Sequence, residues 1–346
     1  GLIGTIGARI GDQRLTMART TPEASDLQRL FASMTEAGVD AVAIEVSSHA
    51  LVLGRVEATR FAAVGFTNLS QDHLDFHGDM ENYYRAKRSL FDPRRAETAV
   101  VSLADEWGSR LASEVEIPVI TTGIESGDVT TRALDAGLAG SSFDLVIDGK
   151  VARVNLALPG RFNVDNALVA AGCASAIGID IESIAKGLSM PITIPGRYER
   201  VDAVADFTVV VDYAHTPEAI ERIVADARAK TPGRVIVVVG AGGDRDTAKR
   251  ADMGAAAATA DISILTTDNP RSEDPDQIIA EMAVGAVRAT TITDRRQAIR
   301  HALELADADD VVLVLGKGHE TTQEIAGDTV PFNDREVVKS ILSEAT

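Results

Sequence analysis

The chain has 346 residues, and 45% of them are hydrophobic, which is enough apolar material for more than one globular core. Its formal net charge of -18 argues against nucleic acid as a partner, because phosphate backbones bind to basic surfaces. The sequence shows no apolar run long enough to span a bilayer and no signal peptide, so we expect no membrane partner. Its one cysteine, Cys173, cannot form an internal disulfide, which favours a buried thiol in a cytoplasmic protein.

Strand and helix patterns alternate along the chain, which is typical of doubly wound α/β domains. The first part predicts a helix at residues 23–37, strands at 39–46, 61–67, 99–103 and 118–122, a hairpin at 143–158 and a helix at 161–177. A polar stretch at residues 68–78 precedes a helix that carries Lys87. Residues 191–196 contain two prolines and a glycine and are the candidate hinge.

After the hinge the pattern starts again. Strands are predicted near residues 207–211, 234–239, 262–265 and 311–315, with helices between them. We therefore predict an α/β fold with two doubly wound domains, residues 1–194 and residues 195–346.

The most informative motif is the run Asp268-Asn269-Pro270-Arg271, which follows the predicted strand at residues 262–265. In α/β sheets ligands bind at the carboxyl ends of the strands, so these side chains are placed to hold a small molecule. A carboxylate and an amide suit an ammonium group, and an arginine can hold a carboxylate through two parallel hydrogen bonds. The alternative is a proline turn followed by a helix cap, and the run by itself does not decide between the two.

Glu45 ends a predicted strand and His73 lies in the polar stretch that follows the next one, so both can reach one edge of the sheet. A carboxylate and an imidazole can bind a divalent cation, and Mg²⁺ takes few protein ligands together with phosphate oxygens and water. The structural alternative is that Ser70 and Asp72 cap the following helix. Lys87 considered alone would be a solvated helix residue.

Three segments occur together and in order in the first part of the chain: Glu45-Val46-Ser47-Ser48-His49-Ala50-Leu51, residues 68–75, and Tyr84-Arg85-Ala86-Lys87. In this combination they resemble the Mur ligases of peptidoglycan synthesis. The resemblance implies an ATP- and Mg²⁺-dependent ligase of an acid with an amino acid, in which Glu45, His73 and Lys87 are catalytic and support the metal ion. This family carries a carbamylated lysine in the helix, and that modification would turn Lys87 from a cation into an anion.

Two segments after the hinge, residues 195–200 and residues 211–217, are similar to signatures at the start of the family's last domain. There an arginine meets the nucleotide phosphates, an aspartate holds the ribose, and two asparagines lie against the adenine. The resemblance therefore implies a nucleotide site formed by Asn163, Asn166, Arg197, Asp212 and His215. The structural alternative, in which Thr216 and Pro217 only start a helix, stays open.

The loop at residues 240–246 imitates a dinucleotide-binding fingerprint, but Arg245 replaces the third glycine of that motif. By the resemblance this loop instead faces the amino-acid substrate. A second motif, Gly316-Lys317-Gly318-His319-Glu320, resembles the family's Gly-Lys-Gly-His-Glu motif. The implied contacts with the amino acid are Arg245, Asp268, Asn269, Arg271, Gly316 and Glu320.

The arginine of the Asp-Asn-Pro-Arg run makes the chain similar to the diaminopimelate-adding Mur ligases, since lysine-adding relatives typically lack it. Meso-2,6-diaminopimelate has a carboxylate and an ammonium where lysine has only an amine, so a guanidinium and a carboxylate suit its far end. The other implied substrate is UDP-N-acetylmuramoyl-L-alanyl-D-glutamate. The matching positions for it are Thr20, Thr21, Ser47 and Arg55, although Thr21-Pro22-Glu23 also fits a helix start.

The family's uridine-nucleotide domain, the first strand of its central domain and its glycine-rich phosphate loop are not found in this sequence. That loop holds the transferring phosphate, so we expect little or no ligase activity from the chain as it stands. We also expect a monomer. Micromolar binding of Mg-ATP would contradict this expectation. The alternatives are a non-catalytic module that retains diaminopimelate binding, an enzyme similar to folylpolyglutamate synthetase, and a nicotinamide dehydrogenase.

Overall fold

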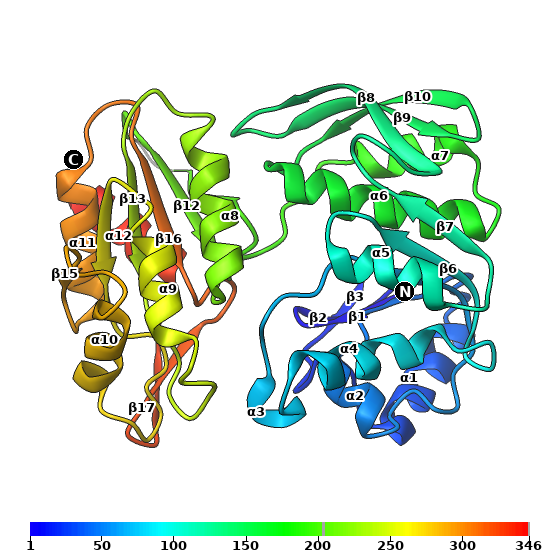
Figure 1. Cartoon of the computed structure of the whole chain (residues 1–346), viewed down its shortest axis with the longest axis horizontal. Coiled ribbons are helices and arrows are strands. Elements are labelled where there is room, and N and C mark those ends of the chain that lie inside the picture. Colours follow the sequence, from blue (N-terminus) through cyan, green and yellow to red (C-terminus); the bar gives the residue numbers. More distant parts are fainter. Residues whose placement is uncertain (203–204, 345–346) are drawn as a thin grey trace.

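The structure is a computed structural model that describes residues 1–202 and 205–344. We call β1 to α7 the N-terminal part and β11 to α12 the C-terminal part; Figure 1 shows them on the right and on the left, respectively.

The N-terminal part alternates strands with helices. Its strands are β1 Leu2–Gly4, β2 Gly7–Ile10, β3 Gln13–Leu15, β4 Ala43–Ile44, β5 Phe61–Phe66, β6 Ala96–Ser102, β7 Val119–Thr122, β8 Val129–Ala136, β9 Ser141–Ile147 and β10 Lys150–Leu156. Its helices are α1 Ala24–Glu36, α2 Ser48–Val52, α3 Leu74–His77, α4 Met80–Arg88, α5 Glu106–Glu114, α6 Arg161–Ala176 and α7 Ile181–Leu188.

These strands form two sheets, one in the order β3-β2-β1-β4 and one in the order β10-β9-β8-β7-β6-β5. The edge strands β4 and β5 thus belong to separate sheets. Residues of both strands line one cavity of about 1570 Å³, which extends to Lys87 and to Tyr213 of the C-terminal part. The cavity therefore joins a sheet edge of the N-terminal part to the contact between the two parts.

Helix α4 positions Lys87 at this cavity. The helix begins at Asp79, whose side chain accepts a 2.7 Å hydrogen bond from the Asn82 N–H and so satisfies one of the free amides of the first turn. Tyr83 and Tyr84 are buried in the core. Lys87 lies one turn after Tyr83 on the same helix face, so it follows Tyr83 toward the cavity.

The C-terminal part is an open sheet covered by helices on both faces. Its strands are β11 Glu199–Arg200, β12 Thr208–Asp212, β13 Val235–Val239, β14 Ile262–Leu265, β15 Thr290–Thr291 and β16 Val311–Leu315, and a separate ribbon consists of β17 Thr322–Ile325 and β18 Asp328–Pro331. Its helices are α8 Pro217–Arg228, α9 Arg250–Ala257, α10 Pro275–Ala283, α11 Arg295–Leu305 and α12 Asp334–Glu344. The sheet order is β11-β12-β16-β13-β14-β15, and β12, β16, β13, β14 and β15 pair in parallel.

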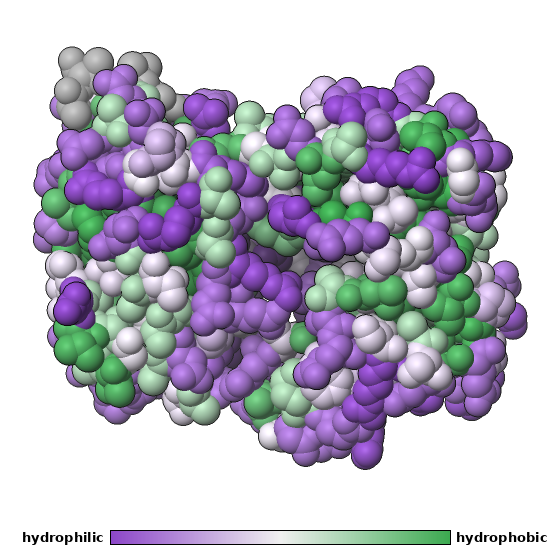
Figure 2. Space-filling model, turned by 45° about the horizontal axis from the view of Figure 1, so that its top comes forward, coloured by the Kyte–Doolittle hydropathy of each residue, from purple (hydrophilic) through white to green (hydrophobic). Residues whose placement is uncertain are grey.

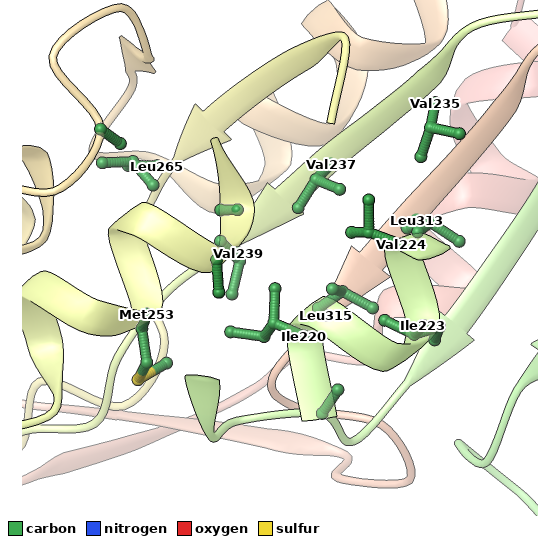
Figure 3. Packing of buried hydrophobic residues seen from close by; sticks show 14 of the residues in the cluster. Ile220, Ile223, Val224, Val235, Val237, Val239, Met253, Leu265, Leu313 and Leu315 are labelled. Carbon is green, nitrogen blue, oxygen red and sulfur yellow. The ribbon is translucent and has the colours of Figure 1, made fainter. Parts of the chain in front are cut away.

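Every residue of β13 and of β16 is buried, as expected for central strands of a parallel sheet. Successive side chains point to opposite faces. Val235, Val237 and Val239 pack with α8 and α9, as Figure 3 shows, whereas Ile236 and Val238 pack with α11 and α12. The carboxyl ends of these strands are consequently held in place by a core on each face.

Most of the predicted elements are present, including the hairpin of β9 and β10, helix α6 and the strands β14 and β16. The strand predicted at residues 39–46 is too long, because only Ala43–Ile44 is extended in a sheet. Its neighbour β1 offers pairing partners only at Leu2 and Ile3, and the other edge of β4 borders the cavity. The polar stretch at residues 68–78 contains the short helix α3, which was not predicted.

The candidate hinge at residues 191–196 lies between the end of α7 at Leu188 and the start of β11 at Glu199. The domain boundary at residue 194 stays a prediction. Within residues 1–202 and 205–344, every helix is too short or too polar to cross a bilayer.

Candidate functional site

Glu45 immediately follows β4 and lines the cavity. The backbone N–H and the hydroxyl of Thr5 both donate to its Oε2, at 2.9 and 2.8 Å. The Thr5 hydroxyl also lies 2.9 Å from the hydroxyl of Thr20, another predicted site residue. These contacts hold one carboxylate oxygen of Glu45 in place and leave the other for a ligand.

Thr21, Ser47 and Arg55 come together beside Glu45. The Thr21 hydroxyl donates to the Glu45 carbonyl at 2.9 Å and accepts the Ser47 N–H at 3.0 Å. The guanidinium of Arg55 donates to the Thr21 carbonyl at 3.3 Å. Ser47 also caps α2. The cap residue of α1 is Glu23, so Thr21 does not cap that helix.

His73 faces the same cavity and has a left-handed backbone with φ of 55°. Its ring packs edge-on against the ring of His49, with 4.9 Å between centroids. Burial lowers the pKa of His73, and the negative charge of Asp72 opposes this effect. A lowered pKa favours the neutral imidazole, which is the form that binds a metal ion.

Lys87 has no hydrogen bond or ion pair with any residue in the described ranges, although its ammonium lies 5.2 Å from the centre of the Tyr83 ring. Burial lowers the pKa of Lys87, and Glu45 and Asp72 oppose this effect. The described residues hold no group of three His, Cys, Asp or Glu side chains suited to a metal ion. Glu45 and His73 are two side chains that can bind a metal ion, and a carbamate on Lys87 would add a third.

Asp72 bridges the two parts of the molecule. The structural alternative is wrong, because neither Ser70 nor Asp72 caps a helix: the N-cap residue of α3 is His73 and that of α4 is Asp79. Its carboxylate lies 3.2 Å from His215 Nε2 and 3.2 Å from Lys249 Nζ, both in the C-terminal part. Burial raises the pKa of Asp72, but the hydrogen bond with His215 and the charge of Lys249 outweigh burial and hold this pKa far below its usual range. Neither this role of Asp72 nor the contribution of Lys249 was predicted, because no local pattern connects residues so far apart in the chain.

Four of the residues predicted to bind the nucleotide fall into two groups, one at the cavity and one on α6. Arg197 and His215 line the cavity, and the Arg197 guanidinium stacks on the Tyr213 ring at 4.6 Å. Asn163 and Asn166 lie in the first turns of α6; Asn163 is buried and donates to the Pro159 carbonyl at 2.7 Å, whereas Asn166 is exposed.

Asp212 ends β12 and is buried. Its two carboxylate oxygens accept backbone N–H groups of Tyr198, at 2.5 Å, and Ala214, at 2.7 Å. Burial raises the pKa of Asp212, and these hydrogen bonds and Arg197 oppose this effect. Asp212 therefore also holds the start of the C-terminal part together, and a ribose would have to share its oxygens.

Four of the residues predicted to bind the amino-acid substrate, Asp268, Asn269, Gly316 and Glu320, meet beyond the carboxyl ends of β14 and β16. The Asn269 amide donates to Glu320 Oε2 at 2.8 Å. Gly316 has φ of 108°, and a Cβ atom at this position would lie 2.5 Å from Asp268 Oδ2. A glycine is required here because it alone tolerates both this backbone and the close approach of the carboxylate.

Asp268 is only 7% exposed, and no described residue donates a hydrogen bond to its carboxylate. Burial raises the pKa of Asp268, and the charges of Lys317 and Arg295 oppose this effect. A buried carboxylate without a hydrogen-bond donor is costly unless a ligand supplies one. Asp268 is thus a candidate acceptor for a hydrogen-bond donor of the ligand.

Arg271 holds the loop at residues 240–246 against the cluster. Its guanidinium donates to the Gly243 carbonyl at 2.7 Å and lies 3.4 Å from the Glu324 carboxylate. Arg245 is exposed at the tip of this loop, where it donates only to the Asp244 carbonyl at 3.2 Å among the described residues.

Figure 2 shows that hydrophilic residues gather where the two parts of the molecule meet.

Comparison with known proteins identifies the family of the chain. The family model of the Mur ligase middle domain matches residues 1–174, and that of the Mur ligase, glutamate ligase domain, matches residues 196–318. The chain is 48% identical to UDP-N-acetylmuramoyl-L-alanyl-D-glutamate–2,6-diaminopimelate ligase of Streptomyces coelicolor, over 99% of this chain and 71% of that protein. It is 44% identical to the ligase of the same name from Caldanaerobacter subterraneus subsp. tengcongensis, over 100% of this chain and 72% of that protein.

Solved structures show the same relationship. A structure of UDP-N-acetylmuramoyl-L-alanyl-D-glutamate–2,6-diaminopimelate ligase is 35% identical, with a TM-score of 0.66 over 99% of this chain and 72% of that one. Folylpolyglutamate synthase of Mycobacterium tuberculosis, solved with ADP and AMPPCP, shares the fold with a TM-score of 0.66 at 20% identity, over 91% of this chain and 70% of that one. From the two matched domains and these identities, the chain belongs to the Mur ligase family.

Proposed function

We propose that this chain takes part in the ATP-dependent formation of an amide between the D-glutamyl carboxyl group of UDP-N-acetylmuramoyl-L-alanyl-D-glutamate and an amine of meso-2,6-diaminopimelate. The observation that carries the proposal is the cluster beyond β14 and β16, where the buried Asp268 carboxylate faces Gly316 beside Asn269 and Glu320. The names of relatives that are 43–48% identical over nearly the whole chain support it.

The cluster suits the far end of diaminopimelate. Asp268 and Glu320 offer carboxylate oxygens to an ammonium, and Arg271 offers a guanidinium to a carboxylate. L-lysine has no carboxylate at this end, so Arg271 would lose its hydrogen bonds to the ligand while keeping its contacts with Gly243 and Glu324. A hydrogen bond to a charged group contributes on the order of 1–3 kcal/mol, which is about tenfold to a hundredfold in affinity.

The cavity of the N-terminal part suits the phosphoryl-transfer half of the reaction. In the proposed reaction ATP phosphorylates the D-glutamyl carboxyl group, and the amine of the incoming amino acid then displaces phosphate from that acyl phosphate. Arg197 would attract the phosphates, and Glu45, neutral His73 and carbamylated Lys87 would hold Mg²⁺. Bound Mg²⁺ supplies charge neutralisation on the transferring phosphoryl group. The chain's own task is to orient the substrates and to exclude water from them.

Calorimetry with meso-2,6-diaminopimelate and with L-lysine tests the amino-acid half of the proposal. The purified chain should bind diaminopimelate at least tenfold more tightly, and Arg271→Lys should remove most of this preference. Arg296→Lys, at a partly exposed position paired with Glu344, is the matched control. Equal binding of the two amino acids, or binding of neither, would contradict the proposal.

Release of ADP from Mg-ATP in the presence of both substrates tests the catalytic half. Selective diaminopimelate binding without ADP release would favour the non-catalytic alternative. The carbamate at Lys87 is tested separately by nuclear magnetic resonance after addition of ¹³C-bicarbonate. A protein-bound carbamate carbon should be observed in the chain without a substitution and should be absent from Lys87→Met.

We also propose that the protein is a cytoplasmic monomer with two domains that meet near residue 194. Sedimentation should give the mass of one chain. Limited proteolysis should cut first in the segment between α7 and β11, which contains neither helix nor strand. A first cut inside a sheet of either part would contradict the domain boundary.

A further inference from the structure

Lys317 is a fully buried lysine, and the proposed reaction gives its side chain no role. It follows β16, and its side chain has no exposed surface. The glycines on either side have φ of 108° and 52°. A Cβ atom at Gly318 would lie 2.7 Å from the Gly196 carbonyl oxygen and from the Tyr213 Cβ, so this tight turn is what directs Lys317 inward.

The ammonium of Lys317 connects two of the groups that face the amino acid. It donates to Asn269 Oδ1 at 3.0 Å and to Glu320 Oε2 at 2.8 Å. An ammonium group only donates hydrogen bonds, so it can accept none from Asn269. The Asn269 amide therefore has to turn its oxygen toward Lys317 and its nitrogen away from it.

The backbone reinforces this orientation. Asn269 Oδ1 also accepts the N–H of Glu324 at 3.0 Å, which uses both lone pairs of the oxygen. Asn269 Nδ2 donates one of its two hydrogens to Glu320 at 2.8 Å. Among the described residues one N–H of Asn269 is left over, and a ligand can approach this residue only as an acceptor.

The charges around Lys317 leave a place for one further cation. Arg295 is fully buried and makes two 2.8 Å hydrogen bonds to Asp334, so the charges of these two side chains neutralise each other. Within the described part of the chain, the Lys317 ammonium pairs with the Glu320 carboxylate, and its charge also acts on the Asp268 carboxylate. These two carboxylates share one ammonium, so a ligand ammonium next to the free N–H of Asn269 would favour the ionised form of Asp268.

We propose that Lys317 is a positioning residue that makes the site selective for an amino acid whose far end carries both an ammonium and a carboxylate. It holds Asn269 as a hydrogen-bond donor to the ligand carboxylate and Glu320 as an acceptor from the ligand ammonium. This inference rests on the proposed function and assigns a second residue, beside Arg271, on which the preference for diaminopimelate over lysine depends.

The variant Lys317→Met removes the ammonium and keeps a side chain of similar length. Lys230→Met is the matched control, because Lys230 is also a mostly buried lysine paired with a carboxylate, Asp226 at 2.7 Å, and it follows α8, outside the amino-acid cluster. Calorimetry with meso-2,6-diaminopimelate and L-lysine, and a thermal unfolding curve, are measured for each variant.

Lys317→Met should lower the preference for diaminopimelate over L-lysine by on the order of tenfold or more, through weaker binding of diaminopimelate. Lys230→Met should keep the preference of the unmodified chain even if its stability falls. A purely structural Lys317 would change the melting temperature and leave the ratio of the two affinities unchanged, which would overturn the inference.

Asn269→Asp gives a second test that does not need Lys317→Met to fold. Aspartate keeps an oxygen for Lys317 and for the Glu324 N–H, but it removes the free N–H donor. Diaminopimelate binding should fall by on the order of tenfold or more. Retained or tighter binding would overturn the inference, whereas an unmodified chain without selectivity would overturn the proposed function itself.

Discussion

Asp72 Oδ1 of the N-terminal part lies 3.2 Å from Lys249 Nζ of the C-terminal part. The two residues are 177 positions apart in the chain, and Asp72 is adjacent to His73, one of the candidate metal ligands. Both side chains are mostly buried, so the pair is less screened by solvent than a surface ion pair. The bridge thus ties the candidate catalytic cavity to the part of the molecule that holds the amino-acid cluster.

Breaking this bridge should loosen the contact between the two parts. We expect Lys249→Met and Asp72→Asn to be coupled by about 0.5–3 kcal/mol in a double-mutant cycle of the free energy of unfolding. Each single variant should also increase the radius of gyration measured by small-angle X-ray scattering. Asp75→Asn, an exposed position of α3, is the control. Additive effects with an unchanged radius would show that the bridge does not hold the two parts together.

Gly316→Ala should disrupt the amino-acid cluster, because the added Cβ would lie 2.5 Å from Asp268 Oδ2. We expect a loss of about 2–3 kcal/mol of unfolding free energy and no measurable diaminopimelate binding. Gly327→Ala is the matched control, since Gly327 also has a positive φ but a Cβ atom added there would meet nothing within 4 Å among the described residues. This control should cost only about 1 kcal/mol and leave binding intact.

Asp165 should make stability depend on pH. Burial raises its pKa from 3.8 to about 6, and Arg161 and Arg222 oppose this effect. The folded state therefore binds more protons than the unfolded state between about pH 4 and pH 6, and stability falls as the pH rises through this window. Asp165→Asn carries no charge at any pH. It should be more stable than the unmodified chain above about pH 6 and show no such gain below about pH 4.

Urea unfolding at several pH values measures this effect for Asp165. Asp180→Asn offers a contrasting case, because hydrogen bonds from Ser183 lower the pKa of Asp180. The asparagine there should reduce stability at neutral pH and lose this effect in acid. A gain for Asp165→Asn that is the same at every pH would refute the role of the carboxylate charge.

Cys173 should react slowly although it lines the cavity. Burial raises its pKa to about 11, so little thiolate is present near neutral pH. At about pH 8 we expect alkylation by iodoacetamide to be on the order of a hundredfold slower than in the chain unfolded in guanidinium chloride. Equally fast reaction in the folded and unfolded chain would show that the thiol is not shielded.

Periodicity and turn residues were sufficient for much of the fold. The all-apolar runs of β13 and β16 predict buried parallel strands, and Asp148-Gly149 predicts the hairpin of β9 and β10. The short strand β4 was predicted too long, since its extent depends on the three-residue partner β1 and not on its own residues. Pairing of this kind joins segments that are distant in the chain and leaves no local pattern.

The candidate site divides in the same way. Motifs in the sequence were sufficient to select the candidate residues, including the Asp268 to Arg271 run and the Gly316 to Glu320 turn, because residue type and spacing at strand ends are local properties. Only the tertiary structure decided how they are held: Lys317 orients Asn269, and Asp72 reaches across to His215 and Lys249. Hydrogen bonds and charge depend on distance in space, which folding alone sets.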